Sequence, residues 1–75
     1  MIPVNKKPTL EELRRQHYFD ISALAGQAGV ESSVIQQMLS RQPVQIYQAE
    51  LVLAALADEF GENYNLDTVD IMLSS

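Results

Sequence analysis

The side chains best placed for chemistry lie in segment 32–40, where hydroxyls and amides recur at helical spacing. At 100° per residue, one face of a helix over this segment carries only small polar side chains: Ser33, Gln36, Gln37 and Ser40. Hydroxyl and amide groups donate and accept hydrogen bonds, whereas covalent chemistry requires an activating base beside a nucleophile. The pattern therefore predicts recognition of a hydrogen-bonding partner.

Residues that catalyse reactions or hold metals are sparse in the sequence. His17 is the single histidine and cysteine does not occur, so neither a thiolate site nor a paired-imidazole metal site is expected. The carboxylates near the end do not alternate around a central glycine as in a calcium loop: Asp58, Glu59, Glu62, Asp67 and Asp70. No nucleophile-base set or glycine-rich phosphate loop occurs. We expect neither an enzyme nor a bound cofactor.

The charges divide unevenly along the chain, although its formal net charge is −5. The five basic residues all stand within the first 41 positions: Lys6, Lys7, Arg14, Arg15 and Arg41. Four acids oppose them there, which gives that half +1, while segment 42–75 has six acids and no base, which gives −6. A broad basic surface is therefore excluded, and nonspecific affinity for nucleic acid should be weak.

A length of 75 residues with 47% hydrophobic content is typical of one small globular domain. No apolar run approaches the ~20 residues that span a membrane, and the start of the chain lacks the apolar stretch of a secretory signal. We expect a cytoplasmic protein with no membrane partner. Residues 1–8 are predicted to form a flexible arm and residues 9–75 the folded domain.

Five helices are predicted, and no strand-like alternation persists. Thr9 and Glu12 match a capping box at the start of the first helix, which closes near Phe19. Asp20 caps a second helix that ends at Gly29. The remaining helices are expected over 32–40, over 46–60 before Gly61, and over 66–73 after Asn65 as a cap.

The apolar faces of these helices are expected to meet in one core. The fourth helix presents the longest stripe: Ile46, Ala49, Leu53, Leu56, Ala57 and Phe60. The fifth presents a shorter one: Leu66, Val69 and Leu73. Leu51, Ile71 and Met72 remain as apolar surface, which favours a homodimer through the fifth helix and the outer part of the fourth. The alternative is that Ile71 and Met72 pack on the first helix as ordinary core.

In this order the segments resemble the lambda-repressor-like helix-turn-helix domains of the Cro/C1 (xenobiotic-response-element) family, over residues 10–73. The matching early positions are a Leu-Arg pair, a polar cap before a Leu-Ala pair, a Gly-Val turn and an inward isoleucine: Leu13, Arg14, Asp20, Leu24, Ala25, Gly29, Val30 and Ile35. Segment 57–61 resembles the family's Ala-x-x-Leu-Gly pattern. The resemblance implies an all-α, compact five-helix fold with a helix-turn-helix at the second and third helices.

The resemblance also implies a sequence-specific DNA-binding transcriptional regulator, most simply a small repressor. It would insert its third helix into the major groove of double-stranded DNA as a homodimer. The base-contacting side chains would be Ser32, Ser33, Gln36 and Gln37, with Val34 near a thymine methyl. The phosphate-contacting side chains would be Lys6, Lys7, Arg14, Arg15 and Arg41. So short a chain leaves no room for a ligand domain, and no small-molecule ligand is expected.

Departures from the family pattern support an alternative. Ile21 stands where a polar residue usually opens the second helix, and Glu31 stands where Ser or Thr usually opens the third. The usual Glu-x-Gly after the third helix reads Leu-Ser-Arg in segment 39–41. Together with the acidic second half, these residues favour a protein-interaction module or an antitoxin-like protein that keeps the fold with little or no DNA binding.

Overall fold

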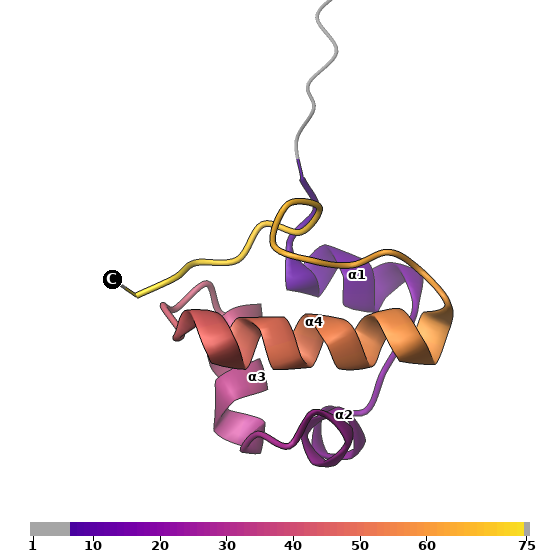
Figure 1. Ribbon diagram of the computed structural model, residues 1–75, viewed down its shortest axis with the longest axis horizontal. Coiled ribbons are helices and arrows are strands. Elements are labelled where there is room, and N and C mark those ends of the chain that lie inside the picture. Colours follow the sequence, from indigo (N-terminus) through magenta and orange to yellow (C-terminus); the bar gives the residue numbers. More distant parts are fainter. Residues whose placement is uncertain (1–6, 75) are drawn as a thin grey trace, which may run out of the picture.

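Four helices make up the regular structure of residues 7–74, the part of the chain that the computed structural model describes. They are α1 (Leu10–Gln16), α2 (Ile21–Ala28), α3 (Ser32–Leu39) and α4 (Ile46–Phe60). In Figure 1, α4 runs across the molecule, with α1 on one side and α2, viewed along its axis, on the other. Helix α2 packs against both α3 and α4. The fold is compact and all-helical, as predicted, but it has four helices in this range.

Helix α1 begins as the sequence predicted. Thr9 Oγ1 accepts a hydrogen bond from the Glu12 amide at 3.2 Å, and Glu12 Oε1 accepts one from the Thr9 amide at 2.8 Å. The helix ends at Gln16, before the predicted closure at Phe19, because His17 has an extended backbone. Phe19 instead enters the core from the connection to α2, with 6% of its surface exposed.

The α2–α3 connection is a sharp turn. The Asp20 carboxylate accepts the Ala23 amide at 2.9 Å and so caps α2. Gly29 ends the helix in the left-handed conformation, with φ 77° and its amide donating to the Ala25 carbonyl. Such a positive φ strains any residue with a Cβ, which explains glycine here. Val30 then packs against the core, so these predictions are confirmed.

Helix α4 has the predicted bounds and ends at Gly61 in the left-handed conformation, with φ 65°. Its buried face is shifted around the helix axis relative to the predicted stripe: Ala49, Val52, Leu53, Ala55 and Leu56 are buried. The prediction that Ile46 faces inward is wrong, because its side chain is 51% exposed. Ala57 and Phe60 are half-buried at the edge of the core.

The predicted fifth helix over 66–73 is wrong. At its expected start, backbone amides donate to side chains. Asn65 Oδ1 accepts a hydrogen bond from the Asp67 amide at 2.8 Å, and Thr68 Oγ1 accepts one from the Asn65 amide at 2.9 Å. Asn and Thr side chains compete in this way with helical hydrogen bonds. The result is a turn, after which Val69 is buried with 1% exposure.

Residues 70–74, called here the C-terminal segment, run extended across two other parts of the chain. The Asp70 amide donates to the Pro8 carbonyl at 2.8 Å. Further on, the Val44 amide donates to the Met72 carbonyl at 3.1 Å, and the Ser74 amide donates to the Val44 carbonyl at 2.8 Å. These pairings form the isolated β-bridges Thr9–Asp70 and Val44–Leu73. These bonds give the Asp70 and Ser74 amides and the Met72 carbonyl partners outside a helix.

No helix within residues 7–74 combines the length and apolarity needed to cross a membrane.

Candidate nucleic-acid interface

The polar face predicted for segment 32–40 lies on the outside of α3. Ser33, Gln36, Gln37 and Ser40 are exposed, and Ser32 is half-buried. No side-chain hydrogen bond within residues 7–74 engages any of these five residues. Their donors and acceptors therefore stay available to an external partner.

The opposite face of α3 fixes the helix in place. Ile35 is fully buried and Met38 nearly so, and both belong to the core that α1, α2 and α4 share. Val34 is also buried, with 6% of its surface exposed. The prediction that Val34 touches a thymine methyl is therefore wrong, because on the helix it lies toward the inward Met38. A rigid inner face gives the outer polar groups a defined direction.

The amino end of α3 carries a negative charge. Glu31 is the N-cap residue, is exposed, and makes no capping hydrogen bond with its side chain. A carboxylate is favourable beside the positive end of a helix dipole. It also opposes any phosphate brought near Ser32 and Ser33. Glu31 therefore repels a polyanion at the first turn of α3. Further along the helix, Gln36, Gln37 and Ser40 are uncharged and cause no such repulsion.

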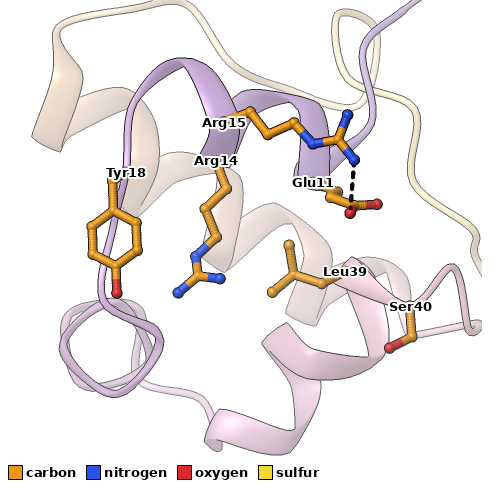
Figure 2. Close-up of a pocket in the computed structure, with 6 residues that line it drawn as sticks. All are labelled: Glu11, Arg14, Arg15, Tyr18, Leu39 and Ser40. Carbon is orange, nitrogen blue, oxygen red and sulfur yellow. Dashed lines mark hydrogen bonds and ion pairs between the residues drawn. The ribbon is translucent and has the colours of Figure 1, made fainter.

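Arg14 and Arg15 line a hollow of about 590 Å³ between α1 and the end of α3. Figure 2 shows Arg14 between Tyr18 and Leu39, with its guanidinium directed away from α1. Arg15 pairs with Glu11 at 3.2 Å, and both side chains are exposed. Ser40 lines the same hollow, so the structure brings two of the predicted phosphate contacts next to the polar face of α3. No pattern in the sequence indicates the hollow, because its lining residues come from two separate parts of the chain.

Arg41 turns toward the C-terminal segment. One guanidinium nitrogen lies 3.0 Å from the Asp70 carbonyl oxygen, and the other lies 3.3 Å from its carboxylate. This pairing links the end of α3 to residues 29 positions later. Lys7 Nζ donates to the Leu66 carbonyl at 3.3 Å. Lys6 lies outside the described residues, as does most of the predicted arm. Arg41 is therefore not held ready for an external anion.

The residues predicted for a dimer interface have different environments. Leu51 on α4 and Met72 in the C-terminal segment are each 43% exposed. Ile71 is half-buried and packs against the core, as the alternative for this residue expected. Tyr47, which was not predicted as an interface residue, is 58% exposed one helical turn before Leu51. Their i, i+4 spacing, which puts both side chains on one face of a helix, can be read from the sequence.

His17 caps the end of α1, and its ring centroid lies 5.1 Å from that of Phe60. Within residues 7–74, no group of three or more His, Asp or Glu side chains is placed to hold a metal ion.

Comparisons with protein-family models, with curated proteins and with solved structures found no match for this chain. The outer face of α3 and the adjoining hollow both carry chemistry suited to a partner.

Proposed function

We propose that this chain is a lambda-repressor-like helix-turn-helix domain that binds duplex DNA with α3 in the major groove and acts as a small transcriptional repressor. One observation carries the proposal: the hydroxyls and amides of Ser33, Gln36 and Gln37 point outward from a rigid helix and are not engaged within residues 7–74. The sharp turn at Gly29 between α2 and α3 supports the proposal, because helix-turn-helix domains present their second helix to a groove after a short turn of this kind.

The dimensions of α3 fit this role. An α-helix with its side chains is about 10–12 Å across, which matches a major groove about 12 Å wide, and the eight residues of α3 extend about 12 Å along its axis. A glutamine amide bonds adenine N6 and N7 together, and each such pair discriminates by about 1–3 kcal/mol. The face lacks Lys and Arg, which are the usual partners of guanine. The preferred half-site is therefore expected to contain A·T pairs opposite Gln36 and Gln37.

The electrostatic contribution should be small for a DNA-binding protein. Arg14 and Arg15 beside the polar face are the candidate phosphate contacts, and Arg41 contributes only by sharing its guanidinium with Asp70. Each phosphate contact adds about −0.9 to the slope of log affinity against log salt. With two to four contacts we expect a slope of about −2 to −4. A homodimer would place two α3 helices about 34 Å apart.

The test begins with selection of bound sequences from a random duplex pool. An enriched inverted repeat then serves in fluorescence-polarisation titrations at two salt concentrations. Gln37→Ala should reduce preference at one base position by about 1–3 kcal/mol. Gln16→Ala, at an exposed amide at the end of α1, is the matched control and should leave the selected sequence unchanged. Arg15→Gln should weaken all duplexes alike and reduce the salt slope by about 1 for each copy bound, or about 2 for a homodimer.

A second candidate is a protein-interaction module with the same fold. Glu31 at the start of α3, which forms no ion pair within residues 7–74, favours it, as does the pairing of Arg41 with Asp70. Failure of every duplex to bind at low salt would overturn the DNA-binding proposal in favour of this module. An identical sequence preference in wild type and in Gln37→Ala would exclude direct base contact by that residue.

A further inference from the structure

The hollow between α1 and the end of α3 combines a charged group with apolar walls. Its lining consists of Glu11, Arg14, Arg15, Tyr18, Leu39 and Ser40, and its volume of about 590 Å³ lies within the usual range of about 300–1,000 Å³ for small-molecule sites. Figure 2 shows Tyr18 and Leu39 on either side of the Arg14 guanidinium. A ligand entering here meets a cation and apolar surface together.

Arg14 is held in a fixed orientation within this hollow. Its Nε donates to the Phe19 carbonyl at 3.1 Å, and its guanidinium carbon lies 4.7 Å from the centre of the Tyr18 ring. Both contacts fix the plane of the guanidinium. No carboxylate of residues 7–74 forms an ion pair with Arg14. Its two terminal nitrogens therefore present an unneutralised fork, whose geometry matches the two oxygens of a carboxylate.

The balance of charge favours a single negative charge on the ligand. Arg15 is already paired with Glu11 at 3.2 Å, so the lining carries a net charge of +1, supplied by Arg14. A dianion such as inorganic phosphate would leave one charge uncompensated beside the Glu11 carboxylate. Leu39, half-buried in the wall, offers apolar contact to the rest of the ligand. Ser40 adds a hydroxyl at the far end.

We propose that this hollow binds a small organic acid with one carboxylate on an aromatic or aliphatic body. The carboxylate pairs with the two terminal nitrogens of Arg14, and the body lies against Leu39 toward Ser40. A fixed fork loses little freedom on binding, which favours a preformed site. The inference is contrary to the expectation from chain length that no small ligand binds. It does not depend on DNA binding, because no groove-reading side chain takes part.

The experiment titrates the full chain, labelled with ¹⁵N, with benzoate, with the neutral isostere benzamide and with inorganic phosphate. We expect benzoate to cause saturable shifts in the amide signals of Leu39 and Ser40 and in the Arg14 Nε signal. Benzamide and phosphate should cause no saturable shift at these positions. Arg14→Gln should weaken benzoate binding by roughly tenfold or more, because a charge-assisted pair is lost. The double variant Glu11→Gln/Arg15→Gln removes the neutralised pair, keeps the net charge of the lining at +1, and should weaken binding far less.

Several results would overturn the inference. Equal shifts with benzamide would show that the carboxylate is not recognised, and equal shifts with phosphate would show a general anion site. Absence of saturation with benzoate, or unchanged affinity in Arg14→Gln, would remove the site altogether. The benzamide and phosphate comparisons use wild-type protein, so they decide the matter even if Arg14→Gln does not fold. No DNA is present, so this outcome is separate from that of the DNA titrations.

Discussion

Arg41 combines a strained backbone with a side-chain pairing that holds two distant parts of the chain together. Its φ of 63° places it in the left-handed region, immediately after the last turn of α3. The Gln42 amide donates to the Gln37 carbonyl at 2.8 Å, which completes a helix end that usually has glycine at the left-handed position. A residue with a Cβ loses about 1–2 kcal/mol there. The pairing with Asp70 offsets part of that cost.

The strain and the pairing at Arg41 can be separated with a double-mutant cycle. Arg41→Gly relieves the strain but removes the contacts to Asp70, so its net effect on the free energy of unfolding should be close to zero. In an Asp70→Asn background the same change should be more stabilising, by up to about 1 kcal/mol, because an exposed ion pair contributes that much at most. Urea titration of the four proteins measures the difference.

The control for this cycle is Asp67→Asn, which removes the same charge from an exposed carboxylate that forms no ion pair within residues 7–74. Arg41→Gly should have the same effect in that background as in wild type. Equal effects in all three backgrounds would mean that the side chains of Arg41 and Asp70 are not coupled in solution.

Tyr64 provides a residue-level prediction about pH. Burial raises the pKa of its phenol above the usual value of 10.0, and the nearby Glu62 carboxylate raises it further. Below pH 10 the phenol is neutral in both states, and its contribution to stability is fully present. As the pH rises beyond that value, the unfolded chain loses its proton first, so stability falls until the pH passes the folded pKa.

Urea unfolding at about pH 9 and about pH 11 should therefore show a loss of stability in wild type that is smaller in Tyr64→Phe. Tyr47→Phe, which changes an exposed tyrosine, should retain the wild-type loss. If Tyr64→Phe and wild type lose equal stability over this range, folding does not raise the pKa of the Tyr64 phenol.

At the scale of elements, α2 contains one glycine that alanine can replace without strain and is followed by one that it cannot. Gly26 lies inside the helix on its exposed face, and an added Cβ would meet no atom within 4 Å. Alanine there should stabilise the protein by about 0.5–1 kcal/mol, because glycine is the poorer helix former. Gly29, at φ 77°, leaves space for a Cβ but not a suitable backbone conformation. Gly29→Ala should therefore destabilise by about 1 kcal/mol or more.

Thermal or urea unfolding of the two variants measures both effects, and each serves as the control for the other because both change glycine to alanine within α2 and its cap. Destabilisation by Gly26→Ala would mean that this face of α2 is covered in solution. A neutral Gly29→Ala would mean that the turn before α3 is not held in the left-handed conformation.

The elements set by neighbouring residues could be predicted from the sequence, and those set by distant contacts could not. Caps at Thr9 and Asp20 and the stop at Gly29 are local chemistry, so α1, α2 and α3 were found close to their true positions. The fifth helix fails for two reasons: side-chain bonds of Asn65 and Thr68 form a turn at its expected start, and the C-terminal segment pairs with Pro8 and Val44, more than 25 residues away. An apolar spacing suited to a helix carries no information about such partners.

The candidate site follows the same division. The outward direction of Gln36 and Gln37 results from helix periodicity and was predicted. The orientations of the basic side chains were not predicted. The orientation of Arg14 depends on Phe19, whose carbonyl it contacts, and the orientation of Arg41 depends on Asp70. The charge distribution shows that all basic residues lie within the first 41 positions, but it does not show which of them are paired with carboxylates in the fold.

At the scale of the whole molecule, exposed apolar side chains occur on the first turns of α4 and in the C-terminal segment that pairs with Val44 before that helix. Tyr47 and Leu51 lie one turn apart on that helix, and Met72 is bonded through its carbonyl to Val44, two residues before the helix begins. These residues lie on α4 and in the C-terminal segment, and none of them belongs to α3. A self-complementary contact here would leave α3 in both copies free, as dimeric recognition of an inverted repeat requires.

Sedimentation velocity over a range of protein concentrations should therefore show a monomer–dimer equilibrium. Leu51→Glu puts a charge into the apolar contact and should shift the equilibrium to monomer, because an unpaired charge is costly to bury. Ala23→Glu adds the same charge to an exposed position in the first turn of α2 and should leave the dimer intact. If Leu51→Glu dimerises as well as wild type, the contact lies elsewhere, and a monomer at every concentration would require α3 to recognise a single half-site.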